Sequence, residues 1–177
     1  MLSLFAKTYS VQKTVIPKSD LLYDKNILRI NTPLPPETIK LFSGSLAIRE
    51  VDAGSTAAEE EELKALTNPY YDAERFGIHF VASPRHADML MVTGPVTRNM
   101  EDALKRTYDA TPTPKIVVAV GDGAIDGGIW KDSYAIVGGV HKVIPVNFSI
   151  TGDPPSAKTI LTALLQIMEI IKEEKDR

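Results

Sequence analysis

Three kinds of residue in this sequence could support chemistry: carboxylates, three histidines and a glycine-rich segment. The histidines are His79, His86 and His141, and the glycine-rich segment runs from Gly121 to Gly128. Cysteine is absent from all 177 residues. The chain therefore has no disulfide, no thiolate zinc site, no cysteine nucleophile and no ordinary cysteine-ligated iron–sulfur cluster.

The glycine-rich segment follows an apolar run and reads GDGAIDGG. Its glycines do not have the GxGxxG spacing of a dinucleotide-binding turn, and no Lys-Ser/Thr pair follows as in a P-loop. We therefore expect a tight loop that needs positive φ rather than a nucleotide-phosphate site. The pair Gly138-Gly139 is interpreted as a turn before a later strand.

Alternating apolar and helix-forming segments must position these residues. The predicted strands are 78–82, 88–93, 115–120 and 143–146, and the runs DMLMVT and KIVVAV are continuously apolar, as in strands buried on both faces. The predicted helices are 57–66, capped by Ser55 or Thr56; 99–107, capped by Asn99; and a last helix capped by Ser156. In the last helix, Ile160, Leu164, Ile167 and Ile171 recur at helical spacing.

This order predicts an α/β fold: a three-layer, mainly parallel and flavodoxin-like sheet with helices on both faces. Residues 46–177 form the predicted domain. Residues 1–45 are predicted to be an extended arm with a short helix at 36–42. In parallel sheets the loops at the carboxyl ends of the strands build the functional site. Here those loops are predicted to be 93–99, 121–128 and 147–155.

Composition narrows the possible partners. The 20 basic and 23 acidic residues leave a net charge of −3, which argues against a nucleic-acid surface. The longest apolar stretch, 160–171, is interrupted by polar residues and is too short to span a bilayer. These features predict a cytoplasmic protein.

Several long motifs together resemble one family. They are REVDAGS, SPRHAD, VTGPVTRN, GDGAIDGG, GGVHKVIPV and GDPP. From about Leu46 to about Leu165 the chain is similar to the electron-transfer small subunit of group 4 membrane-bound [NiFe] hydrogenases and formate hydrogenlyase. That subunit is homologous to the 20 kDa subunit of respiratory complex I (NADH:quinone oxidoreductase).

The resemblance implies one [4Fe–4S] cluster held by four cysteines. Those cysteines fall at Thr56, Glu59, Gly123 and Asp153, and none of the four is cysteine here. Because such a cluster needs soft thiolate ligands, the resemblance predicts that the cluster is lost and that the chain carries no cofactor. Glu59 and Asp153 could instead hold a hard cation, but we favour a former cluster pocket filled by side chains, solvent or an ion pair.

The resemblance further implies a subunit of a membrane-associated hydrogenase-like or complex I-like oxidoreductase, on the cytoplasmic side. Its partners would be a large hydrogenase-like or quinone-reductase-like subunit and membrane-arm subunits. Without the cluster, we expect a structural or coupling role and no catalysis by this chain alone. A redox complex whose chemistry lies wholly in its partners is a second hypothesis. A small-anion-binding module, using the helix starts after Ser55 or Ser156, is a third.

Four residues are candidates for the partner interface: Arg85, His86, Arg98 and Trp130. Each has a local alternative. Arg85 and His86 could belong to a capped strand entry with a local ion pair. Beside Arg98, in the loop after a strand, Asn99 could simply cap a helix, and Trp130 could be a packing residue.

Overall fold

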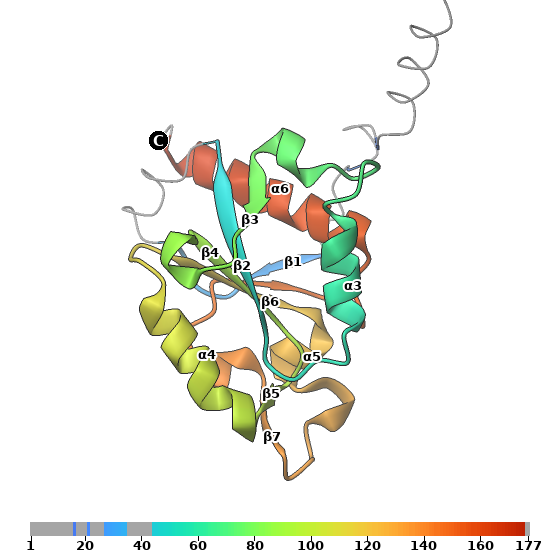
Figure 1. Ribbon diagram of the computed structural model, residues 1–177, viewed down its shortest axis with the longest axis vertical. Coiled ribbons are helices and arrows are strands. Elements are labelled where there is room, and N and C mark those ends of the chain that lie inside the picture. Colours follow the sequence, from blue (N-terminus) through green and yellow to red (C-terminus); the bar gives the residue numbers. More distant parts are fainter. Residues whose placement is uncertain (1–15, 17–20, 22–26, 35–43, 176–177) are drawn as a thin grey trace, which may run out of the picture.

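The computed structural model describes residues 16, 21, 27–34 and 44–175 (Figure 1). The strands are β1 (Leu28–Ile30), β2 (Leu46–Asp52), β3 (Ile78–Phe80), β4 (Met89–Thr93), β5 (Val96–Thr97), β6 (Ile116–Val120), β7 (Ile136–Gly138) and β8 (Phe148–Ile150). The α-helices are α3 (Ala58–Ala65), α4 (Arg98–Ala110), α5 (Gly121–Asp126) and α6 (Ala157–Lys175). Short 3-10 turns are η2 (Ala73–Phe76), η3 (Pro84–His86), η4 (Gly128–Trp130) and η5 (Val140–Lys142).

The main sheet has six strands in the order β1-β8-β6-β4-β2-β3. All neighbouring pairs are parallel except β1 with β8. The central strands β4 and β6 are buried along their whole length, as their unbroken apolar sequences require. The strands β5 and β7 form a separate antiparallel pair. The predicted α/β class with a mainly parallel sheet is therefore confirmed.

Helices cover both faces of the sheet. On one face, α3 and α6 pack on a core that includes Ile48, Met91 and Val118. On the other face, Leu104 of α4 joins a second core with Leu90, Val92, Val117 and Ala119. The four apolar residues expected on the buried face of α6 are all at most 1% exposed. Alternation along each strand thus divides the side chains between two cores.

Several predicted boundaries are wrong. Residues 143–146 do not form a strand: Val143 and Ile144 donate their N–H groups to the Val140 carbonyl, and Pro145 has no N–H to give. The strand that completes the parallel array is β8, a few residues later. The segment 121–128 is not only a loop, because α5 begins at Gly121, and Gly138 ends β7 instead of forming a turn before a later strand.

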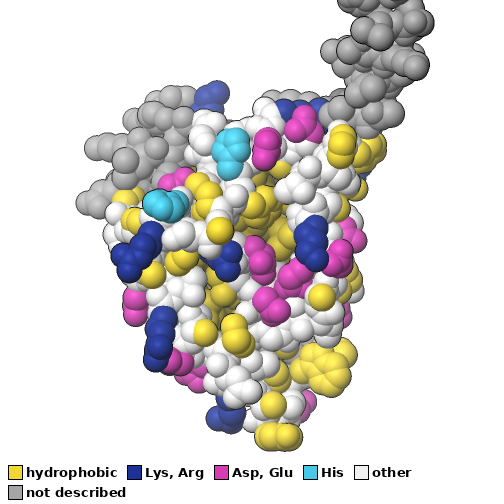
Figure 2. Space-filling model, viewed as in Figure 1, with side chains coloured by type: hydrophobic (Ala, Val, Ile, Leu, Met, Phe, Trp, Pro, Cys, Tyr) yellow, Lys and Arg dark blue, Asp and Glu magenta, His cyan; other side chains and the backbone are white. Residues whose placement is uncertain are grey.

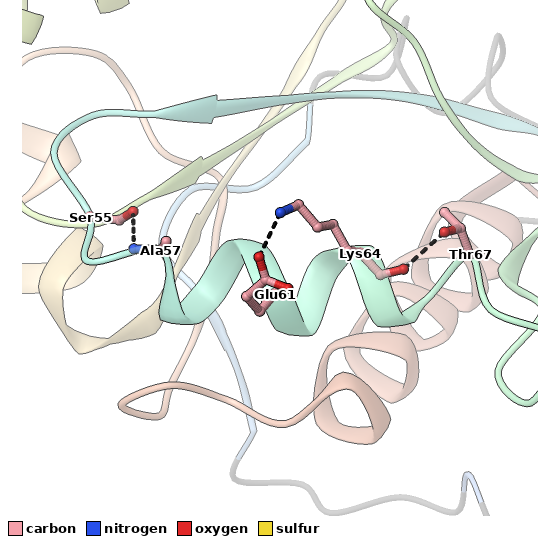
Figure 3. A network of polar contacts seen from close by, with 5 residues as sticks. All are labelled: Ser55, Ala57, Glu61, Lys64 and Thr67. Carbon is pink, nitrogen blue, oxygen red and sulfur yellow. Dashed lines mark hydrogen bonds and ion pairs between the residues drawn. The ribbon is translucent and has the colours of Figure 1, made fainter.

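The predicted N-caps also differ. The helix α4 begins at Arg98 with Thr97 as its N-cap residue, so Asn99 lies inside the helix. The N-cap residue of α3 is Ala57, which has φ 67° and no side-chain cap. The Ser55 hydroxyl instead accepts the Ala57 N–H at 3.1 Å, just before the helix (Figure 3). Ser156 does serve α6, because its hydroxyl accepts the Thr159 N–H at 3.3 Å.

Part of the first 45 residues contributes to the same core. Strand β1 extends the sheet beside β8, and Ile16, Leu21 and Leu34 are buried. The Ile16 N–H donates to the Tyr70 carbonyl at 2.8 Å. The predicted short helix at 36–42 lies outside the described residues.

The largest apolar contribution outside the sheet comes from α6. We expect Leu164→Ala, at a fully buried position, to lower the free energy of unfolding by about 2–5 kcal/mol through lost burial and a residual cavity. Denaturant titration followed by circular dichroism measures this. Ile129→Ala, at a position 80% exposed, is the control and should change stability by less than about 0.5 kcal/mol. Equal effects of the two substitutions would contradict the placement of α6.

Candidate functional site

The carboxyl ends of β2, β4, β6 and β8 converge at one edge of the sheet. The segments that follow them enclose a cavity of about 120 Å³. Its lining is Ser55, Thr56, Glu59, Gly94, Pro95, Gly123, Gly128, Ile129, Trp130 and Asp153. The three loops predicted to form the site all contribute. The loop after β2, between Asp52 and α3, also contributes, although β2 itself was not predicted as a strand.

Hydrogen bonds between loops hold this edge together. The Asp122 N–H donates to the Gly152 carbonyl at 2.8 Å, and the Gly152 N–H donates back to the Asp122 carboxylate at 3.0 Å. This reciprocal pair joins the start of α5 to the turn before α6. After β2, one Asp52 carboxylate oxygen accepts the N–H groups of Gly54 and Ser55. The cavity therefore has a fixed backbone frame.

The four positions of the expected cluster ligands all line this one cavity. Their side chains differ greatly in environment. Thr56 and Asp153 are exposed, whereas Glu59 is only 4% exposed. Gly123 is buried and has no side chain. The structure therefore brings the four positions together as the resemblance implies, although they share no common ligand chemistry.

The backbone around Gly123 leaves little room for a side chain. A Cβ there would lie 3.0 Å from Cδ and 3.2 Å from the N atom of Pro95. At Gly121, where φ is +86°, a Cβ would lie 2.7 Å from Oε1 of Glu59. The Pro95 ring thus occupies the space beside Gly123, and the Glu59 side chain occupies the space beside Gly121.

Burial raises the pKa of Glu59, and the nearby carboxylates of Glu60, Asp153 and Asp52 raise it further. A hydrogen bond with its own backbone lowers the pKa but does not offset these effects. No lysine or arginine is among the described residues that line the cavity. The site therefore disfavours the charged form of Glu59 relative to an exposed glutamate.

The donor set does not fit a [4Fe–4S] cluster. Such a cluster needs thiolate or, less often, imidazole ligands. One position here has no side chain, two carry carboxylates and one carries a hydroxyl. None of the three histidines lines the cavity. Within the described part of the chain, no group of three or more His, Cys, Asp or Glu side chains is arranged to hold a metal ion.

The predicted interface residues lie at two ends of the sheet. Arg85 and His86 are exposed in η3, which precedes β4 and so lies at its amino end. Arg98 begins α4 beyond the carboxyl end of β4, and its Nε donates to the Tyr134 carbonyl at 2.6 Å. Trp130 lines the cavity and is 50% exposed. The structure thus brings Arg98 and Trp130 to the cavity end and places the other two elsewhere.

Carboxylates disfavour anion binding at both predicted helix starts. At the start of α6, the carboxylate of Glu62 accepts the Ala157 N–H at 2.6 Å. An anion there would have to displace this negatively charged group. At the start of α3, the neighbouring carboxylate is the buried Glu59, which also disfavours an anion.

The structure has a second concave region, which was not predicted from the sequence. It lies between α3 and the end of β2, and its polar lining includes Glu50, Asp52 and Glu60. The strand that carries Glu50 and Asp52 was not predicted, so no sequence pattern placed these carboxylates opposite α3.

Comparison with known proteins agrees with this architecture. A family model described as NADH ubiquinone oxidoreductase, 20 Kd subunit, matches residues 57–167. The chain belongs to this family. It is 39% identical over 139 residues to a probable membrane-bound hydrogenase subunit of Pyrococcus furiosus, covering 76% of this chain and 83% of that protein.

Two further relatives extend the comparison. Formate hydrogenlyase subunit 7 of Escherichia coli (strain K12) is 38% identical over 136 residues, which are 77% of this chain but only 53% of that protein. A chain in the structure of the membrane-bound sulfane sulfur reductase, an archaeal respiratory membrane complex, is 34% identical with a TM-score of 0.67. The match covers 78% of this chain and 76% of that one. Membership of this 20 kDa-subunit family thus accounts for the fold.

Glu59→Gln tests the electrostatics of the cavity. Because the folded-state pKa is raised above 4.5, wild-type stability should fall as the pH rises from about 4.5 through that pKa. Glutamine keeps the shape without the charge, so the variant should be more stable at neutral pH by on the order of 1 kcal/mol. Denaturation at several pH values measures this. Glu61→Gln, at an exposed position on the same helix, should leave the pH dependence unchanged.

Gly123→Ala tests the close packing at Gly123, one of the four expected cluster-ligand positions. Since the new methyl group would press on Pro95, we expect a loss of about 1–3 kcal/mol in the free energy of unfolding. Pro95→Ala removes the Cδ atom in question. The double variant should therefore lose less than the sum of the two single variants, and strict additivity would contradict the contact.

Proposed function

We propose that this chain is a non-redox subunit of a membrane-associated hydrogenase-like or complex I-like oxidoreductase complex, with a structural or coupling role. One observation carries the proposal. The four positions that would hold the cluster line one cavity, but they present a hydroxyl, a buried carboxyl, a glycine and an exposed carboxylate. The scaffold of an electron-carrying subunit is kept, whereas its ligands are not.

Loss of the cluster has a direct consequence for electron flow. The family places its cluster as a relay, and nothing in the donor chemistry of this cavity offers a replacement redox centre. Electrons would then have to cross the whole subunit in one step. The proposed subunit is therefore not catalytic by itself, and any redox chemistry of the assembly would lie in its partners.

The partners proposed are a large hydrogenase-like or quinone-reductase-like subunit and membrane-arm subunits. Relatives with membrane-bound hydrogenase and membrane-complex names support this association. The exposed apolar side chains of Ile129, Trp130 and Tyr134, beside the cavity, also support it, because large exposed apolar groups mark interaction sites. Figure 2 shows hydrophobic side chains at the end of the molecule that carries β5 and β7. We propose that Arg98 and Trp130 contact the large subunit there.

The proposed location is peripheral, on the cytoplasmic side of the membrane, through the complex. None of the helices in the described residues is both long enough and apolar enough to cross a bilayer. Attachment in this proposal comes from the partner subunits.

Metal analysis of the intact complex tests the proposal. The complex is purified from membranes through an affinity tag on this chain, and its subunits are separated without oxygen. We expect other subunits to copurify, with no iron or acid-labile sulfide on this chain and no [4Fe–4S] signal from it in electron paramagnetic resonance. A stoichiometric cluster on this chain would overturn the non-redox assignment. Purification of the chain alone would overturn its role as a subunit.

A further inference from the structure

The region between α3 and the end of β2 forms a groove of about 610 Å³. We name it the β2–α3 groove. Its polar lining is Arg49, Glu50, Asp52, Glu60, Lys64 and Thr67, and its apolar lining is Ala57, Leu63, Phe80, Val81 and Ala82. It shares no lining residue with the cavity at the expected cluster-ligand positions. Figure 2 shows acidic side chains gathered in the middle of this face.

One wall of the groove is an open strand edge. Strand β3 pairs with β2 only over Leu46–Ile48, whereas β4 pairs with β2 as far as Asp52. On the β3 side, the pairing begins where the Leu46 N–H donates to the Gly77 carbonyl at 2.8 Å, and it ends where the Ile48 carbonyl accepts the Val81 N–H at 2.8 Å. Because strand residues alternate in the direction of their backbone groups, those of Glu50 also point to this side. An extended segment could pair there.

None of the three carboxylates in the groove forms an ion pair with a described residue. Oε1 of Glu50 and Oε2 of Glu60 are buried and accept no hydrogen bond. The ion pairs among the described residues are Lys64–Glu61, Lys105–Glu101 and Arg106–Asp102, so none includes Glu50, Asp52 or Glu60. Lys64 lines the groove, but its Nζ lies 2.6 Å from Glu61, on the exposed surface of α3 (Figure 3). The Thr93 hydroxyl donates to the other oxygen of Glu60, and one oxygen of Asp52 accepts the N–H groups of Gly54 and Ser55.

Burial and the neighbouring Glu60 carboxylate raise the pKa of Glu50, while Arg49 lowers it. Two unbonded carboxylate oxygens in one groove are costly, and a donor that reaches both would remove that cost. A bound metal ion is disfavoured, since the described residues contain no group of three or more ligating side chains. An organic cation with a long apolar stem matches both the carboxylates and the apolar lining.

We propose that the β2–α3 groove receives an extended segment of a partner subunit, whose lysine or arginine side chain binds between Glu50 and Glu60. The open edge of β2 supplies backbone hydrogen bonds to that segment. The apolar residues at the end of β3 contact its aliphatic side chains. This inference rests on the proposed function, because it requires a partner subunit in the same complex.

Site-specific cross-linking in the native complex tests it. A photo-reactive benzoylphenylalanine replaces Ala82, which is exposed and lines the groove, and a matched chain carries it at Asp102, on α4. After irradiation of membranes, the complex is purified and the cross-linked peptide is sequenced by mass spectrometry. We expect the Ala82 probe to capture a partner segment with a lysine or arginine within a few residues of the cross-link. We expect the Asp102 probe not to capture that segment.

The double variant Glu50→Gln/Glu60→Gln removes the two charges and keeps the shapes. It should reduce the yield of that cross-link about tenfold, since removing the charges abolishes the ion pair. Glu61→Gln, one residue away on α3, should leave the yield unchanged. Thermal unfolding checks that the double variant is folded, and its melting temperature should equal or exceed that of the wild type.

The outcomes separate the two proposals. If the wild-type chain purifies without partners, the proposed function fails. If the complex purifies but the Ala82 probe captures nothing, captures only this chain, or captures a segment without lysine or arginine, the groove inference alone fails. An unchanged yield in the folded double variant also overturns it. Once the basic residue is known, reversing it to glutamate together with Glu60→Arg should restore the cross-link lost in either reversal alone.

Discussion

Parallel pairing of β2, β4, β6 and β8 is the constraint on which the rest of this structure depends. Because the four strands run in the same direction, their carboxyl ends meet at one edge, and the four following segments must meet there too. The central strands are buried on both faces, so a slip of one residue would move each side chain into the opposite core. Residues as distant in sequence as Thr56 and Asp153 are thereby fixed around one small cavity.

The backbone around the cavity keeps its arrangement although none of the four expected cluster-ligand positions carries a cysteine. The backbone still brings the four positions together, and the reciprocal hydrogen bonds between Asp122 and Gly152 still join two of the loops. The side chains no longer share a chemistry. Burial and the nearby carboxylates raise the pKa of Glu59, and no lysine or arginine in the lining offsets them. In place of a uniform set of soft ligands, the small cavity is lined by hydroxyl, carboxyl and apolar groups, Pro95 among them.

The β2–α3 groove differs from the cavity in size and in the state of its carboxylates. It is larger and open, and its carboxylates are fixed before any partner arrives. The short β3 strand leaves the end of β2 unpaired, and the helix α3 places Glu60 across from Glu50. Preformed charge of this kind favours specificity and register more than raw affinity. The surface around α3 thus carries a small cavity at the expected cluster-ligand positions and a larger groove, the proposed contact region.

Much of the fold followed from the sequence alone. The continuous apolar runs of β4 and β6 predicted buried strands, and the spacing of apolar residues in α6 predicted one buried helical face. The α/β class and its layers could therefore be predicted from local patterns. The absence of cysteine likewise determined that this chain holds no thiolate-bound cluster.

Boundaries that depend on long-range hydrogen bonds were not determined in this way. The edge strand β1, the mixed-polarity strand β2 and the late strand β8 each form only because a distant strand accepts their backbone groups. For the same reason, only the tertiary structure decided that Glu59 is buried, that Pro95 closes on Gly123 and that Glu50 faces Glu60: burial and charge proximity depend on which distant segments pack together, and a single sequence does not contain those distances.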